Sequence, residues 1–153
     1  MTAALISLDA YRSHLGRELG CSRWFDVTQD RIDTFGHVTE DRQFIHVDPA
    51  AAARSPFGGT IAHGFLTLSL LSAMAFDAIP AIEGAQMGVN YGFNSIRFLA
   101  PVRSGKRVRG RFTLQDLKLR GENQWQSTIG TVVEIEGEPK PALAAEWLTI
   151  TTF

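Results

Sequence analysis

The chain has 153 residues, of which 44% are hydrophobic and 20% are charged, and its formal net charge is −1. This length fits one domain around one hydrophobic core, so we expect residues 1–153 to form a single domain. A nearly neutral chain has no general basic field to attract nucleic acid and no polar excess that predicts disorder, so the expected partner is a small molecule or another protein.

Cysteine content and hydropathy indicate a cytoplasmic protein without a metal centre. Cys21 is the single cysteine, so it cannot form an internal disulfide, and no pair of Cys or His residues has the spacing of zinc ligands. The N-terminal segment lacks a positively charged start and contains Asp9, unlike a signal peptide. The longest uncharged apolar stretch, 64–76, is shorter than the roughly 20 residues that cross a bilayer. We therefore expect no disulfide, no bound metal and no membrane partner.

Short elements are predicted for the first third of the chain. Residues 4–15 have a weak helical pattern, and residues 21–27 have the pattern of a short strand. Thr28 suits the N-cap of a helix over 28–38. Asp48, which is followed by proline, suits the N-cap of another short helix, and the segment SPFGG then ends that helix.

A long apolar segment and a set of alternating segments follow. Residues 62–79 are apolar nearly all round the helical wheel, which is typical of a buried core helix. Beyond it, four segments alternate with period two between turn residues, as antiparallel strands do. They cover residues 86–102, 106–121, 123–137 and 141–153. This order predicts an α+β domain in which a curled antiparallel sheet wraps a central helix, the hot-dog fold. The sheet edges and the uncovered side of the helix favour a homodimer.

Polar residues that can do chemistry gather directly before the core helix. Asp41 and His46 lie in a segment that does not suit a continuous surface helix, so a turn can point both side chains at one spot. An acid and a histidine together can bind and deprotonate a water molecule near neutral pH. His63 and Gly64 then open the helix, where unpaired N–H groups and the helix dipole can stabilise an oxyanion. This combination suits the addition of water to an α,β-unsaturated thioester.

The same segment resembles the MaoC-like (R)-specific enoyl-CoA hydratases, a family with the hot-dog fold. The family motif runs approximately Gly-Asp-x-Asn-Pro-Ile/Leu-His, and an Asp-Pro helix start, an alanine-rich turn and a glycine-rich segment ending in His-Gly follow it. The chain has EDRQFIHVDPAAAARSPFGGTIAHG in this place, without a gap. The resemblance covers most of the chain and is closest to the nodulation protein N-like branch of the family. It implies that Asp41 and His46 are catalytic and that Gly64 provides the oxyanion site.

Three residues depart from the family motif. Glu40 replaces the usual glycine, Gln43 the usual asparagine and Phe44 the usual proline. Gln43 keeps an amide that can orient the water or the histidine, although at a longer reach. Phe44 loses the fixed φ of proline, and Glu40 places a second carboxylate beside Asp41. The reaction type is therefore better supported than the substrate, whose acyl chain length and carrier the sequence leaves open.

The resemblance implies hydration of trans-2-enoyl thioesters such as enoyl-CoA to (R)-3-hydroxyacyl thioesters, or the reverse dehydration. The thioester partner is carried by coenzyme A or by an acyl carrier protein, and no separate cofactor is implied. Gln43, His63 and Gly64 are the candidate substrate-binding residues, although a histidine at a helix start more often packs or forms a structural hydrogen bond.

Two alternative functions stay open. A hot-dog acyl-CoA thioesterase usually carries its acid within the central helix, and here that helix has only Asp77, in its last turn. A non-catalytic acyl-binding or dimerisation module is the other alternative, because the altered motif permits a loss of chemistry.

A basic cluster can serve either as a phosphate contact for coenzyme A or as a solvated sheet face. Strand alternation explains most of its members as a solvated face, which is the usual meaning of such charge runs. The members are Arg103, Lys106, Arg107, Arg109 and Arg111.

Overall fold

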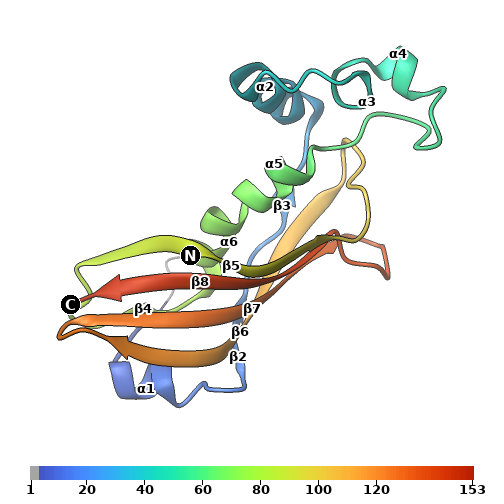
Figure 1. Ribbon diagram of the computed structural model, residues 1–153. Helices are drawn as coiled ribbons and strands as arrows, with labels where there is room; N and C mark the ends of the chain where they lie inside the picture. The colour runs from blue at the N-terminus through green and yellow to red at the C-terminus, as the bar shows by residue number, and fades with distance from the viewer. Residues whose placement is uncertain (1–3) are drawn as a thin grey trace.

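The computed structural model describes residues 4–153 and shows an antiparallel sheet curled beside a central helix (Figure 1). Residues 1–3, with which the predicted domain begins, lie outside the described residues. The elements in chain order are β1 (Leu5–Ile6), α1 (Leu8–Arg12), β2 (Glu18–Cys21), β3 (Phe25–Asp26), α2 (Gln29–Thr39), α3 (Phe44–Val47), α4 (Pro49–Ala52), α5 (Gly64–Ser69), α6 (Leu71–Ala78), β4 (Ala81–Ile82), β5 (Met87–Phe98), β6 (Arg107–Arg120), β7 (Gln124–Ile135) and β8 (Leu143–Thr152).

The sheet confirms the predicted antiparallel strands and the α+β hot-dog class. Its strand order is β2-β6-β7-β8-β5, and β3 also pairs with β6. The long neighbouring strands β5 to β8 are antiparallel throughout. Along β6, Val108, Phe112 and Leu114 are buried, whereas Arg107 is exposed and Arg109 is half-buried. One face of the sheet therefore meets the core and the other meets solvent, as the alternation predicted.

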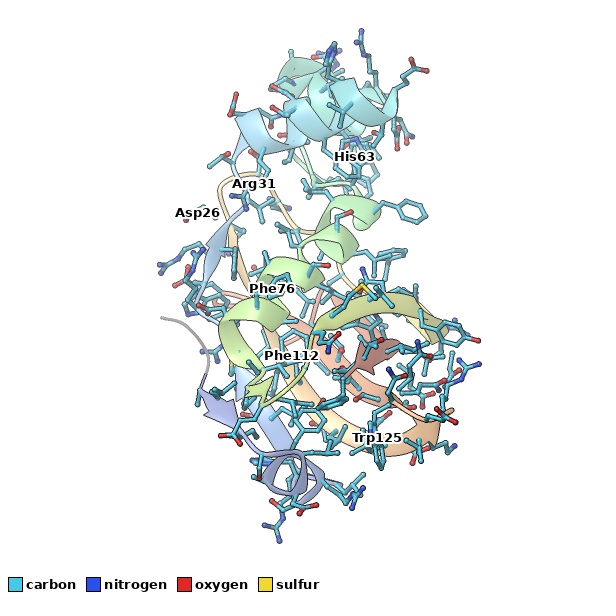
Figure 2. All side chains as sticks on the ribbon, turned by 90° about the vertical axis from the view of Figure 1, so that its left-hand side faces the viewer. Asp26, Arg31, His63, Phe76, Phe112 and Trp125 are labelled. Atoms are coloured by element: carbon cyan, nitrogen blue, oxygen red, sulfur yellow. The ribbon has the colours of Figure 1, made fainter. Side chains whose placement is uncertain are left out.

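The core helix is confirmed, although it consists of two segments. The segments α5 and α6 join at Leu70, whose φ of −69° and ψ of −15° remain helical, so the chain direction is kept. Both segments run across one face of the sheet, and Figure 2 shows Phe112 beneath α6. A Cβ at Gly110 of β6 would lie 3.1 Å from the Cβ of Met74 on α6. Glycine at this position therefore permits the close approach of helix and sheet.

The three short helices before the core helix gather beyond the N-terminal end of α5, past the end of the sheet (Figure 1). The Thr28 hydroxyl accepts a hydrogen bond from the Arg31 N–H at 3.2 Å and caps α2. The Asp48 carboxylate accepts one from the Ala51 N–H at 2.9 Å and caps α4, which begins with Pro49. Both predicted N-caps are therefore confirmed. The helices α2 to α4 hold the polar segment beside the start of α5.

Two elements differ from their predictions. The strand predicted over 21–27 is divided into β2 and β3. The Ser22 hydroxyl lies between them, where it accepts from the Gly110 N–H at 3.0 Å and donates to the Arg23 carbonyl at 2.8 Å, and such local side-chain bonds compete with a regular ladder. The helix predicted over 4–15 is limited to α1, because the residues before it form β1 and pair with β4. Within residues 4–153, no helix has the length and apolar character required to cross a membrane.

Apolar side chains remain exposed on the core helix and on the sheet edge. Among the described strands, β5 pairs with β8 alone, so its outer edge carries unpaired backbone groups. The core helix keeps one exposed side, which includes Phe65 and Phe76, in line with the uncovered side expected from the sequence. We call the following residues the apolar edge surface: Phe65, Phe76, Met87, Val89, Tyr91 and Phe98.

Candidate active site

The polar residues at the start of the core helix form one cluster. An oxygen of the Asp41 carboxylate and one ring nitrogen from each of His46 and His63 lie within 4.8 Å of one another. Asp41 follows α2, His46 lies in α3 and His63 directly precedes α5, so three elements converge here. Figure 2 shows His63 where the α2–α3 region meets α5. The fold therefore brings the predicted pair together and adds His63 as a third member.

Three hydrogen bonds fix the position of His46, which is 7% exposed. Its N–H donates to the Gln43 carbonyl at 2.9 Å, and its own carbonyl accepts from the Gln29 amide at 2.7 Å. The ring Nδ1 lies 2.7 Å from the carbonyl oxygen of Ile61. A carbonyl can only accept, so Nδ1 carries the proton and Nε2 keeps its lone pair. His46 is thereby prepared to act as a base through Nε2.

Burial also favours the uncharged form of His46. Desolvation lowers the pKa of His46 below its ordinary value of 6.5, the hydrogen bond to Ile61 raises it, and the neighbouring His63 lowers it. Asp41 has a smaller raising effect, and the net change is downward. A neutral imidazole is the form that can accept a proton from water. The environment therefore suits a general base at neutral pH.

His63 is the most buried member of the cluster, with 1% exposure. Its Nε2 lies 2.9 Å from the main-chain carbonyl oxygen of Asp41, and its ring stacks on that of His46 at a centroid distance of 3.8 Å. Its Nδ1 is buried and has no hydrogen-bond partner within the described chain. The geometry therefore shows the packing and hydrogen-bonding role that is usual for a histidine at a helix start.

The backbone conformation at Glu40 explains why the family motif has glycine at this position. Glu40 ends α2 with a φ of 62°, and it is the only residue of the described chain other than glycine with a positive φ. Left-handed backbone at a helix end strongly favours glycine, because a Cβ is strained there. The exposed Asp41 follows this turn directly. The departure therefore adds local strain while the chain keeps the path that leads Asp41 to the cluster.

Gly64 lines a cavity. It is the first residue of α5, and its N–H has no hydrogen-bond partner within the described chain. A cavity of about 250 Å³ reaches Gly64 and Thr67 and is also lined by Ile61 and Phe98. A Cβ on Gly64 would lie 3.0 Å from the Phe98 ring, so glycine lets this ring pack closely against the backbone. The position implied as the oxyanion site therefore has both a free donor and adjoining space.

Gln43 and Phe44 keep the backbone path of the motif although the residues differ. Phe44 is the first residue of α3, the position at which proline is favoured, and the ψ of 137° at Gln43 suits a residue that precedes proline. The Gln43 side chain is exposed and makes no hydrogen bond within the described chain. The side-chain amide of Gln43 therefore takes no part in the hydrogen bonds that hold Asp41, His46 and His63 together.

An acid with two histidines is also a common set of metal ligands. The rings of His46 and His63 are inclined by only 27° and stack face to face. Lone pairs lie in the ring planes, so two stacked rings do not direct their nitrogens at one ion at the usual distance of about 2.0–2.1 Å. The arrangement therefore suits proton transfer better than metal coordination.

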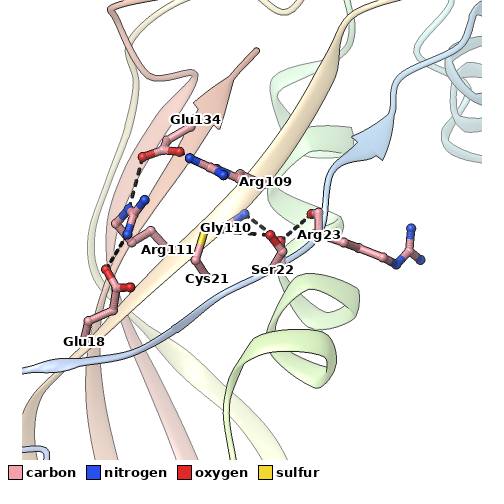
Figure 3. A network of polar contacts seen from close by, with 8 residues as sticks. All are labelled: Glu18, Cys21, Ser22, Arg23, Arg109, Gly110, Arg111 and Glu134. Carbon is pink, nitrogen blue, oxygen red and sulfur yellow. Dashed lines mark hydrogen bonds and ion pairs between the residues drawn. The ribbon is translucent and has the colours of Figure 1, made fainter. Parts of the chain in front are cut away.

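The basic strand face is paired with acids. Arg111 contacts Glu18 at 2.6 Å and Glu134 at 3.1 Å, and Arg109 contacts Glu134 at 2.6 Å (Figure 3). These pairs fit a solvated sheet face and leave fewer free cations for a phosphate. Of the cluster, Arg103 has no ion pair within the described chain. The other pairs on this face are Arg107 with Glu136 and Lys106 with Glu138.

Sequence reasoning missed Gln29, which ties three segments together. Its amide nitrogen donates to the His46 carbonyl at 2.7 Å and to the Asp33 carboxylate at 2.8 Å. Its amide oxygen accepts from the Thr60 hydroxyl at 2.5 Å. These bonds link α2 with α3 and with the segment that leads to α5. No motif marks Gln29, because its partners at His46 and Thr60 lie far away in sequence.

Gly36 is a second residue that sequence reasoning missed. A Cβ at this position of α2 would lie 3.0 Å from the Asp41 carbonyl oxygen and 3.4 Å from Cε1 of His63. Gly36 follows the buried Ile32 by one helical turn, so it lies on the inward side of α2. A glycine on the buried side of a predicted helix was the available signal for a close approach.

Fold and site together define a class: a hot-dog domain in which an acid and a histidine lie next to the first residue of the central helix. The family model described as MaoC like domain matches residues 11–137. Nodulation protein N from Rhizobium leguminosarum bv. viciae is 54% identical over 149 residues, which are 97% of this chain and 92% of that protein. The 3-hydroxyacyl-thioester dehydratase Z of Mycobacterium tuberculosis (strain ATCC 25618 / H37Rv) is 44% identical over 131 residues, 86% of each protein.

A solved structure agrees with these sequence relatives. The (R)-hydratase from A. caviae involved in PHA biosynthesis superposes with a TM-score of 0.71 and 25% identity, over 88% of this chain and 94% of that one. The chain therefore belongs to the MaoC-like dehydratase family, and nodulation protein N is among its near relatives. The resemblance stated from the motif is confirmed.

Proposed function

We propose that the chain adds water to trans-2-enoyl thioesters to give (R)-3-hydroxyacyl thioesters, or runs the reverse dehydration. The observation that carries this proposal is the cluster of Asp41, His46 and His63, whose carboxylate oxygen and ring nitrogens lie within 4.8 Å of one another. The name of the 44% identical mycobacterial relative, a 3-hydroxyacyl-thioester dehydratase, supports the same chemistry. Nodulation protein N, at 54% identity, carries no enzymatic name.

Asp41 and His46 act together in the proposed reaction. They bind a water molecule and take one of its protons, with Nε2 of His46 as the prepared acceptor, while the water oxygen attacks the β-carbon. The electrons of the C=C π bond move toward the thioester carbonyl. The α-carbon then receives a proton from the same pair, so one C–O and one C–H bond form and no proton is gained or lost overall. Proton transfer groups of this kind contribute about 10²–10⁴-fold to the rate.

Gly64 is the proposed donor to the thioester oxygen, which becomes negative as the π electrons move. Its N–H has no other partner in the described chain, and the cavity of about 250 Å³ gives a thioester space beside it. One such donor contributes about 2.7–4 kcal/mol to transition-state stabilisation. Gln43 is proposed to contact the substrate or the attacking water through its exposed amide.

The proposed substrate is an acyl thioester of coenzyme A or of an acyl carrier protein, with no separate cofactor. Assays of trans-2-enoyl-CoA substrates from short to long, followed by the loss of conjugation, will define the acyl chain length. A cytoplasmic location, expected from the single cysteine, stays a prediction.

Substitution of the two proposed catalytic residues tests the assignment. Asp41→Asn and His46→Gln are each expected to lower the hydration rate of crotonyl-CoA by at least about 10²-fold, because each removes a proton acceptor. Circular dichroism is expected to show a folded protein in both cases. Asp48→Asn and His37→Gln are matched controls, since Asp48 caps α4 and His37 is exposed on α2. Near wild-type turnover of both site variants would end the assignment.

Thioester hydrolysis is less well supported than hydration. Asp77, the only acid of the central helix, lies in the last turn of α6, at the opposite end from Gly64. Its carboxylate accepts a hydrogen bond from the Arg23 N–H at 2.6 Å. A thiol reagent that detects free coenzyme A released from saturated acyl-CoA distinguishes hydrolysis from hydration.

A non-catalytic acyl-binding module is expected to give neither hydration nor hydrolysis in these assays. Such a module binds enoyl-CoA and leaves the conjugated thioester unchanged even at high protein concentration. The prepared Nε2 of His46 and the free N–H of Gly64 are features that binding alone does not require. They favour the catalytic proposal.

A further inference from the structure

We infer that His63 is a positioning residue of this site, which holds the main chain of Asp41 and the ring of His46 and does not contact the substrate. The inference rests on the proposed function, because it assigns a role within the same cluster. It is carried by two contacts of the His63 ring and by the way in which the ring is enclosed.

The first contact fixes the loop that carries Asp41. Nε2 of His63 lies 2.9 Å from the carbonyl oxygen of Asp41. A carbonyl oxygen only accepts, so His63 is the tautomer that donates from Nε2–H. Asp41 is exposed and follows the left-handed turn at Glu40. A hydrogen bond from the interior therefore anchors a loop whose side chains otherwise face solvent.

The second contact fixes the ring of His46. The two imidazoles stack with centroids 3.8 Å apart and planes inclined by 27°, and the Phe35 ring packs on His63 at 5.0 Å. The hydrogen bond from Nδ1 of His46 to Ile61 sets one end of the His46 ring, and the stack sets its plane. Together they direct Nε2 of His46.

The enclosure of His63 argues against direct contact with a substrate. A Cβ on Gly36 would lie 3.4 Å from Cε1 of His63, so α2 closes the space on that side. His63 is 1% exposed, its Nε2 is used by Asp41, and its Nδ1 is buried without a partner in the described chain. A buried polar atom without a partner destabilises a fold, so a residue that served only for packing would be better apolar. The Nε2–H donor explains why an imidazole is present.

His63 also affects the charge state of His46. The titratable groups that face His46 are Asp41, from the loop after α2, and His63, from the start of α5. The helix α2 contributes the uncharged amide of Gln29, which also binds the Asp33 carboxylate. His63 is one of the influences that lower the pKa of His46, so its removal is expected to raise that pKa.

The test compares His63→Phe, which keeps a flat ring without the donor, with His63→Gln, which keeps an N–H donor. With crotonyl-CoA, His63→Phe is expected to lower kcat by about 10²-fold while KM changes by less than about twofold. His63→Gln is expected to stay within about tenfold of the wild-type kcat, because the bond to Asp41 survives. His14→Phe is the matched control, since His14 also binds a main-chain oxygen, that of Ala10, at 2.9 Å, but lies outside the cluster.

Nuclear magnetic resonance of the same proteins provides a second measurement that does not depend on activity. His63→Phe is expected to shift the amide signals around Asp41 and to raise the pKa of His46, and His14→Phe is expected to change neither. A raised KM with an unchanged kcat would show substrate contact and overturn the inference. Unchanged kcat and unchanged signals would also overturn it.

The two proposals can fail separately. An inactive wild-type protein sinks the proposed function, whereas the resonance measurements still decide whether His63 positions Asp41 and His46. If His63→Phe does not fold, His63→Gln carries the test: a wild-type KM with partial kcat supports positioning, and a raised KM with full kcat contradicts it.

Discussion

Glu40 has the most strained backbone of the residues around the site, because it has a positive φ although it is not glycine. Its φ of 62° ends α2 and turns the chain toward Asp41. A left-handed backbone costs a residue with a Cβ about 1 kcal/mol or more, whereas glycine adopts it without this cost. The same turn leads the chain from α2 into the loop that carries Asp41.

Replacement of Glu40 by glycine is therefore expected to stabilise the protein. Glu40→Gly should raise the free energy of unfolding by about 1 kcal/mol, measured by urea denaturation. Glu40→Ala removes the same carboxylate but keeps a Cβ, so it is expected to give no comparable gain. Equal gains from both substitutions would show that the charge of Glu40, and not its backbone, is the cause.

His46 is expected to make stability depend on pH. Burial lowers the pKa of His46 below 6.5, so the unfolded chain binds a proton more readily than the folded chain. The stabilisation is full above pH 6.5 and is lost as the pH falls through the lowered pKa. The difference in unfolding free energy between wild type and His46→Gln should shrink from about pH 7.5 to about pH 5 in urea titrations. A difference that grows over this range contradicts the direction of the shift.

The residues of the site could be predicted in part. The motif marked Asp41 and His46, which the fold brings together, and Gly64, whose role stays a proposal. The tautomer of His46 could not be predicted, since it depends on the carbonyl of Ile61, which every residue type carries. The positive φ at Glu40 could not be predicted either, because the chain lacks the glycine that usually marks such a backbone.

At the scale of elements, α2 serves as the wall of the site. Gly36 is buried on this helix, and a Cβ there would lie 3.0 Å from the Asp41 carbonyl oxygen and 3.2 Å from a methyl carbon of Val47. The carbonyl cannot move freely, because His63 holds it by a hydrogen bond. The close approach of α2 to the loop that carries Asp41 therefore depends on the absence of a side chain at Gly36.

Gly36→Ala is expected to act against the usual helix preference. In an ordinary helix interior, alanine stabilises by about 0.5–1 kcal/mol relative to glycine. Here we expect no gain in unfolding free energy and a fall in kcat of about tenfold or more, as the loop with Asp41 is displaced. Gly59→Ala is the control, since its Cβ would meet no atom within 4 Å. A stabilised and fully active Gly36→Ala protein would refute the wall function of α2.

Long periodic elements were predictable, whereas their interruptions were not. The strands β5 to β8 and the core helix follow from apolar periodicity, which burial enforces over many residues. The break between β2 and β3 comes from the hydroxyl of Ser22, and the helix α3 is only four residues long. Short elements of this kind depend on tertiary contacts with Gln29, Gly110 and similar partners, which no local pattern records.

At the scale of the whole molecule, one side of the core helix leaves large apolar side chains exposed. We propose that the apolar edge surface is the interface of a homodimer in which β5 and the core helix face a second copy. Phe76 is 81% exposed, and Val89 and Tyr91 of the edge strand β5 are 42% and 53% exposed. Large exposed apolar patches beside an unpaired strand edge mark interaction surfaces.

A charge on the apolar edge surface is expected to give monomers. Val89→Glu should move the protein from dimer to monomer in sedimentation experiments, because an interface cannot bury an unpaired carboxylate without a large cost. Leu119→Glu is the control, since Leu119 is 56% exposed but lies on β6. A wild-type protein that sediments as a monomer at all concentrations contradicts the dimer.

The most direct test of the central claim is the reaction of the wild-type protein with crotonyl-CoA. The expected result is a loss of the absorbance of the conjugated thioester, with (R)-3-hydroxybutyryl-CoA as the product, and a loss of this activity in both Asp41→Asn and His46→Gln. An unchanged thioester at high protein concentration, or a product of the opposite configuration, would contradict the account.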